Sequence, residues 1–175
     1  MKKRILASVL VLVMLICLLP VTAIADENKG WKVDGQTVTI YNAEGLRAWA
    51  ASITNEHASY DGFTVSIEKD IDLSDAAWTS IIGLGGTITI DGKGHTISNM
   101  RIDEQRNGKA PYYNTYLGFI GDIAYGTHLT IQDITFENAH VQDLDGDSQY
   151  SWCGVVVGHG PMDEIEKAHP DVMNI

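Results

Sequence analysis

The chain has 175 residues and a formal net charge of −11, with 23 acidic against 12 basic side chains. Such a balance argues against nucleic-acid binding, because phosphate recognition needs clustered lysine and arginine. Its two cysteines are Cys17 and Cys153, so removal of the N-terminal segment would leave Cys153 alone and exclude an intrachain disulfide.

Residues 1–25 have the pattern of a secretory signal peptide. A basic head at 2–4 precedes an apolar run from Ile5 to Leu19, and Ala23-Ile24-Ala25 supplies small residues at the processing positions. Cleavage would leave Asp26 first and, with three basic residues lost, change the charge from −11 to −14. The alternative is an uncleaved anchor, although this run is shorter than the about 20 residues of a membrane span. We expect a secreted or cell-wall-associated protein with no stable membrane insertion after cleavage.

A helix is predicted over about 42–55. Asn42 suits the N-cap, and the apolar residues Leu46, Trp49, Ala50 and Ile53 recur at helical spacing on one face. This position near the mature N-terminus predicts that the helix covers the open end of a sheet-built core. An ordinary helix of an α+β domain is the alternative.

The rest of the chain alternates like strand. The tetrapeptide TVTI at 37–40 returns as TVSI at 64–67, as TITI at 87–90 and, more loosely, as HLTI at 128–131. The spacings are 27, 23 and 41 residues. If the first spacing contains the helix as an insertion and the last spacing covers two turns, the underlying period is about twenty residues. This length is typical of stacked repeats.

A second correspondence links Thr96–Ile102 to Thr135–Val141 at a constant offset of 39. It makes Asn99 and Asn138 equivalent, which predicts a structural asparagine stack. Asp91-Gly92 and Gly94 predict a sharp corner between the flanking strands, although the same signal could close an antiparallel hairpin. Repetition with one polarity favours parallel stacking. The predicted fold is all-β: a right-handed parallel β-helix (solenoid) with a short N-terminal capping α-helix, truncated at its C-terminal end.

The ordered motifs resemble one family of bacterial surface proteins. They are the Asp70–Leu73 element followed by Trp78, the turn Asp91–His95, and the glycine segments Gly118–Gly121 and Gly154–Gly158. Together they resemble the pectate-lyase-like parallel β-helix regions that carry GLUG-type repeats, over roughly residues 35–160. The resemblance implies a structural or adhesive region of a secreted or cell-surface protein. The family's glycines serve backbone packing rather than catalysis, and "GFIG" and "GVVVG" are imperfect copies of its motifs.

Three parts are expected: the signal peptide at 1–25, a parallel β-helix domain with its helical cap at 26–160, and a non-repeat tail at 161–175. The tail lacks the repeat pattern and ends without a sorting signal. It could fold over the last strands as a short helix, or the reading frame could be truncated. An exposed last strand would present unpaired backbone, so self-association through this edge is also expected.

Two groups of residues are candidate binding sites. Tyr112, Tyr113 and Tyr116 fall in a long excursion between strands, where aromatic rings could stack on the faces of sugars or instead pack over the flank of the core. Asp143, Asp145 and Asp147 alternate as in a calcium loop, but Ser148 and Gly154 occupy the places where the hand-shaped motif needs glycine and glutamate. An irregular calcium site and a solvated acidic turn are the two interpretations, and no other cofactor is expected. Cys153 lies in an apolar segment and is predicted to be a small buried residue.

The catalytic alternative depends on Asp70, Asp72 and Asp75. A polysaccharide lyase would need such carboxylates and a basic residue on the same face, for which Arg101 is the nearest candidate. The sequence does not place Arg101 there, so no catalytic residue is assigned. The function expected is that of a structural or adhesive module with a glycan or a surface protein as partner. A fragment of a polysaccharide lyase or glycoside hydrolase is the alternative.

Overall fold

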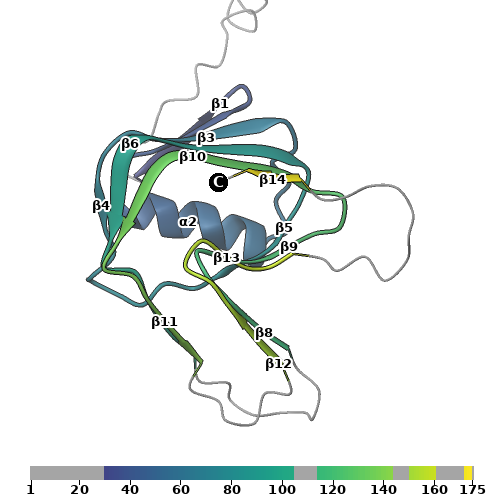
Figure 1. The fold of residues 1–175 in the computed structure, drawn as a ribbon. Helices are drawn as coiled ribbons and strands as arrows, with labels where there is room; N and C mark the ends of the chain where they lie inside the picture. The colour runs from purple at the N-terminus through teal and green to yellow at the C-terminus, as the bar shows by residue number, and fades with distance from the viewer. Residues whose placement is uncertain (1–29, 105–113, 144–149, 161–171, 175) are drawn as a thin grey trace, which may run out of the picture.

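A computed structural model describes residues 30–104, 114–143, 150–160 and 172–174 (Figure 1). The described residues are mostly strand. The predicted signal peptide and most of the predicted tail lie outside them. No helix among the described residues has the length and apolar character to cross a membrane. The strands are β1 (Trp31–Asp34), β2 (Thr37–Ile40), β3 (Phe63–Ile67), β4 (Ile71–Asp72), β5 (Ile81–Leu84), β6 (Thr87–Ser98), β7 (Arg101–Glu104), β8 (Asn114–Leu117), β9 (Ile120–Ile123), β10 (His128–Glu137), β11 (His140–Asp143), β12 (Tyr150–Cys153), β13 (Val157–His159) and β14 (Val172–Asn174).

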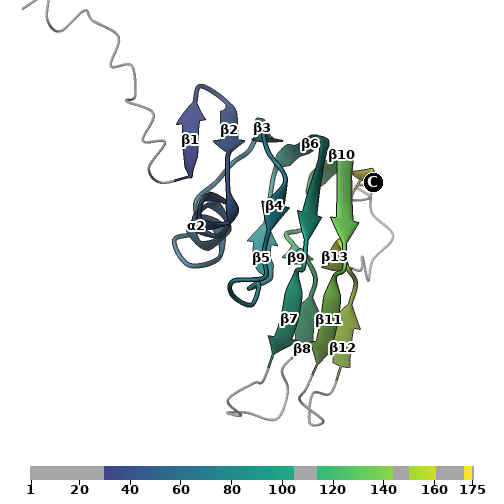
Figure 2. The same ribbon diagram turned by 90° about the vertical axis from the view of Figure 1, so that its left-hand side faces the viewer.

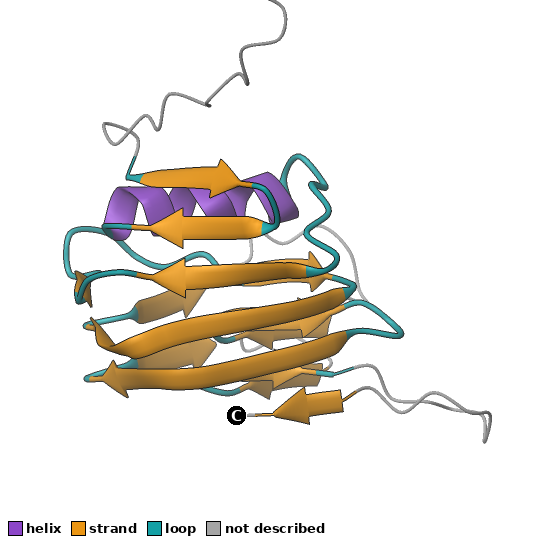
Figure 3. Cartoon of the chain, turned by 90° about the horizontal axis from the view of Figure 1, so that it is seen from above, coloured by secondary structure: helices purple, strands orange, loops and turns teal. Residues whose placement is uncertain are grey.

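Helix α2 (Ala43–Thr54) forms where the apolar spacing predicts it. The Asn42 side chain caps the first turn by accepting a hydrogen bond from the Gly45 N–H at 2.8 Å. The face that carries Leu46 and Trp49 is buried. Figures 2 and 3 show α2 at the end of the molecule where β1 and β2 lie. The helix is thus held by its cap at one end and by its apolar face along its length.

The largest sheet has the strand order β1-β2-β3-β6-β10-β14, with β4 also paired to β6. β1 and β2 are antiparallel, whereas the other pairs in this sheet are parallel. Three smaller parallel sheets have the orders β11-β7, β12-β8 and β13-β9-β5. Strands in these smaller sheets lie across the core from the largest one or extend beyond it (Figure 1).

Two strand registers agree with offsets found in the sequence. His128 pairs with Thr87 and Thr135 with Thr96, which are the offsets of 41 and 39. β2 and β3 also pair as their tetrapeptides align, with Thr37 opposite Thr64. β3 and β6 do not pair as their tetrapeptides align, because Thr64 lies opposite Thr89 instead of Thr87. A shift of two residues keeps every side chain on the same face, so the alternation of the sequence is satisfied equally by either register.

The predicted all-β right-handed parallel β-helix is therefore wrong. The described residues form one mixed sheet, in which β1 is antiparallel to β2, and three smaller parallel sheets, and no closed sheet or solenoid is found among them. The error has a physical source: alternation shows which face of a strand is buried, but not which way its neighbour runs or where a sheet ends. β1 illustrates this, because the Gly35 turn (φ 56°) folds it back on β2 as an antiparallel partner.

The chain bends at the corner predicted near Asp91, and Gly94 has the predicted positive φ, but the bend lies within one strand. β6 runs unbroken from Thr87 to Ser98, and the strand bends at an irregularity opposite Gln132–Ile134. The positive φ angles belong to Lys93 (50°) and Gly94 (80°), while the Asp91 carboxylate accepts a hydrogen bond from the Lys93 N–H. Gly92 serves close packing instead, because an added Cβ would lie 2.4 Å from the Ile134 Cβ.

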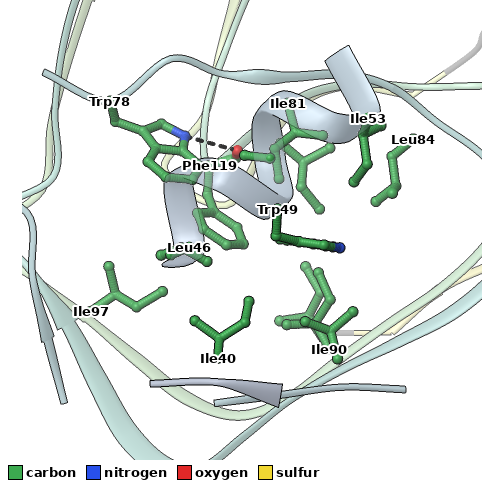
Figure 4. Close-up of a cluster of buried hydrophobic side chains, with 14 of the residues drawn as sticks. Ile40, Leu46, Trp49, Ile53, Trp78, Ile81, Leu84, Ile90, Ile97 and Phe119 are labelled. Carbon is green, nitrogen blue, oxygen red and sulfur yellow. Dashed lines mark hydrogen bonds between the residues drawn. The ribbon is translucent and has the colours of Figure 1, made fainter. Parts of the chain in front are cut away.

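The core lies between α2, the largest sheet and the opposite strands (Figure 4). Trp78 joins the layers, since its ring stacks on Phe119 at 5.2 Å and its Nε1–H donates to the Phe119 carbonyl at 3.0 Å. Ile71 and Leu73 are buried in this core. Burial of such side chains contributes roughly 1.5–3 kcal/mol each relative to leaving them exposed.

Gly45 generates a test of the contact between α2 and the start of β1. A Cβ at Gly45 would lie 1.9 Å from the Gly30 carbonyl oxygen. Gly45→Ala should therefore lower the free energy of unfolding in urea, although alanine in a helix normally stabilises by about 1 kcal/mol. Ala48→Gly, at an exposed position of the same helix, is the control and should cost about 1 kcal/mol. A higher unfolding midpoint for Gly45→Ala would contradict this packing.

Candidate functional site

Three turns that are distant in the sequence border one polar groove. It has a volume of about 350 Å³. The turns follow β4, β6 and β10, and the groove is lined by Leu73, Ser74, Asp75, Ala76, Ala77, Asn99, Met100, Arg101, Asn138 and His140. We call it the Asn99 groove. Its wall offers carboxylate, amide, guanidinium and imidazole groups, and the exposed residues Ala76 and Ala77 add apolar surface.

Backbone hydrogen bonds hold the three turns against one another. The Leu73 N–H donates to the Ser98 carbonyl at 2.9 Å, and the Asn99 N–H donates to the Glu137 carbonyl at 3.0 Å. The His140 N–H then donates to the Met100 carbonyl at 2.8 Å. The spacing of the groove side chains is therefore set by strand pairing, and a ligand would meet a prearranged surface.

A ladder of side-chain hydrogen bonds crosses the groove. Asn138 Nδ2 donates to Asn99 Oδ1 at 2.6 Å, and Asn99 Nδ2 donates to Asp72 Oδ1 at 2.9 Å. Both asparagines adopt positive φ, 57° and 51°, a conformation that asparagine tolerates better than most residues. The predicted asparagine stack is present, and it ends on the Asp72 carboxylate.

Arg47 fastens the first of the three turns to helix α2. Its Nη2 lies 2.9 Å from the Asp75 carboxylate and donates to the carbonyls of Ala76 at 2.7 Å and Leu73 at 3.3 Å. Because this side chain is 24% exposed, its charge is partly withdrawn from water. The negative charge at Asp75 is accordingly balanced from behind the groove.

A second cluster lies at the other end of the groove. Arg101 Nη1 contacts the Asp103 carboxylate at 2.7 Å, and His140 Nε2 lies 3.7 Å from the same carboxylate. His140 Nε2 also lies 3.2 Å from Gln142 Oε1. Parallel pairing of β11 with β7 places His140 directly opposite Arg101. Both side chains are exposed and could contact a ligand.

The acidic groups near the groove favour their ionised forms. Hydrogen bonds from Asn99 and then Ser74 lower the pKa of Asp72. Bonds from the Thr96 N–H and then from His95 lower the pKa of Asp70, and Lys93 followed by Ser66 lowers the pKa of Glu68. None of these three carboxyl groups has the raised pKa that a general acid at neutral pH requires.

Of the three predicted tyrosines only Tyr116 is described, and it does not line this groove. Tyr116 lies on β8 and stacks on Trp152 at 5.2 Å and against His159 at 4.6 Å. His159 Nδ1 in turn lies 2.9 Å from Asp122 Oδ1. Tyr112 and Tyr113 lie outside the described residues. Tyr116 therefore remains a candidate ligand contact within an aromatic cluster that is half-buried.

Of the predicted calcium ligands, only Asp143 is described. It is half-buried at the end of β11, and the Ser151 hydroxyl donates to its carboxylate. Asp145 and Asp147 lie outside the described residues. No group of three metal-binding side chains is found within the described ranges. The calcium site thus stays a prediction.

The structure brings together some, but not all, of the residues that a polysaccharide lyase would need. Arg101 and Asp75 line the same groove, and Asp72 reaches it through Asn99. Asp70 bonds to His95 at 3.0 Å instead. Each charged member already has a protein partner, namely Asp103 for Arg101 and Arg47 for Asp75. Sequence reasoning found Asn99 and Asn138 as structural residues but missed Arg47 and His140, which carry no local motif.

Comparisons with protein-family models, with curated proteins and with solved structures find no match for this chain. The resemblance to GLUG-type regions therefore depends on the quoted motifs alone. Any function must be argued from the residues of the groove themselves.

The lowered carboxyl pKa values predict how stability depends on pH. Glu68, Asp70 and Asp72 have ordinary pKa values of 4.5, 3.8 and 3.8, and folding lowers each of them. Their stabilisation is complete above these ordinary values and is lost as pH falls through the lowered folded values. Urea midpoints should be level from about pH 7 to 5 and fall below about pH 4.5.

The variant Asp72→Asn should show a shallower loss of stability in acid than the wild type. Asp34→Asn, which changes an exposed carboxylate at the far end of β1, is the control and should keep the wild-type slope. Equal slopes for all three proteins would show that the Asp72–Asn99 bond does not contribute to acid stability.

Proposed function

We propose that this protein is a secreted or cell-surface binding module of structural or adhesive type, and that it binds neutral glycan in the Asn99 groove. The observation that carries the proposal is the groove itself. Amide, carboxylate and imidazole groups from three turns surround a hollow of about 350 Å³, a size within the usual range of ligand sites. Extracytoplasmic location is supported by the leader-like residues 1–25.

The chemistry of the groove suits sugar hydroxyl groups. A hydroxyl both donates and accepts hydrogen bonds, so it is matched by asparagine amides, which do the same. Asn138 is exposed and donates one hydrogen of its side-chain amide to Asn99. The remaining hydrogen-bonding positions of that amide face the groove or solvent. The exposed methyl groups of Ala76 and Ala77 supply apolar contact for the carbon faces of a sugar ring.

The charge balance favours neutral over acidic glycan. Arg101 is paired with Asp103, while the Asp72 and Asp75 carboxylates lie on the same side of the molecule. A uronate would have to compete with Asp103 for Arg101 and approach two carboxylates of like charge. A neutral oligosaccharide meets neither cost.

A polysaccharide lyase is the second candidate, because Arg101 and Asp75 line one groove. That activity would require Arg101 to leave Asp103 and act on a proton next to a uronate carboxyl group. Incubation with oligogalacturonate and calcium tests it directly. Release of unsaturated product would favour the enzyme over the binding module, and its absence together with binding of neutral sugar would favour the module.

Binding can be mapped by titrating the ¹⁵N-labelled protein with hexasaccharides of β-1,4-linked glucose, N-acetylglucosamine and galacturonate. We expect a neutral hexasaccharide to shift the amides of residues 73–77, 99–101 and 138–140. His140→Ala should weaken that binding about five- to tenfold, the effect of one hydrogen bond. His128→Ala is the matched control, since His128 is exposed on β10 but does not line the groove. Shifts confined to residues around Tyr116, or equal effects of both variants, would refute the groove as the site.

A further inference from the structure

A second, smaller pocket adjoins the Asn99 groove. It has a volume of about 200 Å³ and lies between α2 and the segment that leads from β4 to β5. It is lined by Arg47, Ala50, Ala51, Thr54, Asn55, Ala77, Trp78 and Thr79. We call it the Ala51 pocket. Ala77 lines the groove as well, so the two hollows meet at this residue.

The inner wall of the Ala51 pocket is apolar and held in place. The Trp78 ring is buried, and its Nε1–H already donates to the Phe119 carbonyl (Figure 4). The Trp78 backbone N–H donates to the Arg101 carbonyl at 2.8 Å, which ties this wall to a residue of the groove. The methyl groups of Ala51 and Ala77 add to the apolar lining. Such a wall favours an apolar group of a ligand.

Polar groups border the same pocket. Asn55 and Thr79 are exposed, and a side-chain amide and a hydroxyl can each donate and accept hydrogen bonds. Arg47 Nε, by contrast, is buried and has no hydrogen-bond partner among the described residues. A ligand oxygen that reached it would pair a donor that is otherwise unsatisfied. The pocket therefore suits a small group that carries both a donor and an acceptor.

The charge of the pocket is already balanced. Arg47 is the charged residue in its lining, and its Nη2 lies 2.9 Å from the Asp75 carboxylate. The same nitrogen donates to the carbonyls of Ala76 and Leu73. An anionic group would have to compete with Asp75 for this guanidinium, whereas a neutral group would not.

We propose that the Ala51 pocket takes the N-acetyl group of a sugar bound in the Asn99 groove, so that the preferred ligand is a glycan of N-acetylhexosamine type. An acetamido group combines a methyl group with one acceptor and one donor, which matches an apolar wall bordered by polar side chains. The volume of about 200 Å³ is below the roughly 300–1,000 Å³ of sites that enclose a whole ligand, so it suits a substituent. This inference rests on the proposed glycan binding and adds the class of sugar.

Calorimetric titration of the full chain with two neutral hexasaccharides tests the proposal. β-1,4-Linked N-acetylglucosamine and β-1,4-linked glucose differ in whether the ring carries an acetamido group or a hydroxyl beside the anomeric carbon. We expect the N-acetylglucosamine hexasaccharide to bind at least about tenfold more tightly, because one buried methyl group and one hydrogen bond contribute together. In ¹⁵N spectra it alone should shift the backbone amides of residues 50–55 and 79.

Ala51→Leu fills the pocket while leaving the lining of the groove unchanged. Ala51 is half-buried and lines the pocket but not the groove, and leucine is a good helix former. This variant should reduce the preference for N-acetylglucosamine to less than about twofold and keep the affinity for the glucose hexasaccharide. Ala48→Leu, exposed on the same helix and outside both hollows, is the matched control and should retain the full preference.

Thr79→Ala is a second and smaller change, at an exposed position of the pocket. It should weaken binding of the N-acetylglucosamine hexasaccharide about two- to tenfold, the effect of one hydrogen bond, and leave the glucose hexasaccharide unaffected. Circular dichroism and urea unfolding check that each variant is folded.

The outcomes separate this inference from the proposed function. Equal affinity of the wild type for the two hexasaccharides, or a preference that survives Ala51→Leu, would overturn the N-acetyl assignment and leave glycan binding in the groove. Binding of neither hexasaccharide would overturn both. A peptide with an acetylated lysine offers the same acetamide group, and tighter binding of such a peptide than of the N-acetylglucosamine hexasaccharide would overturn the assignment to a sugar.

Discussion

β6 and β10 pair in parallel over almost their whole length, and this pairing determines where the side chains at both ends of the strands lie. At one end Ile88 and Leu129 meet inside the core, and at the other Ser98 and Glu137 bring the following turns together. The Asn99–Asn138 bond of 2.6 Å is a direct consequence. Strand pairing thus both closes the core and builds the groove.

Local features of the sequence were sufficient for several elements. Asn42 and the spacing of Leu46, Trp49, Ala50 and Ile53 predicted α2 to within a residue, because capping and burial both act within one helix. The offsets of 41 and 39 predicted the β6–β10 register, since equivalent side chains on both strands must face the same core. The fold class was not predictable in this way. Alternation does not distinguish antiparallel β1 from a parallel strand, or one register of β3 from another two residues away.

The Asn99 groove could not be predicted from the sequence for a related reason. Arg47 reaches Asp75 across 28 residues, and His140 comes opposite Arg101 across 39, so neither pair leaves a local motif. Asn99 and Asn138 were identified because they belong to equivalent segments. Strand pairing holds the polar groups of this site in place, and hydrogen bonds stabilise its ionised Asp72 carboxylate. The prediction that Cys153 is buried is wrong, because the residue is exposed on β12 although its segment is apolar.

The most direct test of the account is the direction of pairing between β6 and its neighbours, measured by nuclear Overhauser effects between backbone protons in solution. Parallel pairing predicts contacts between the segments 96–98 and 135–137 whose residue numbers rise together, at a constant difference of 39. Contacts between 87–90 and 96–100, with numbers rising in one segment and falling in the other, would instead indicate a hairpin closed at Asp91-Gly92. That result would remove the strand pairing, the asparagine ladder and the groove together.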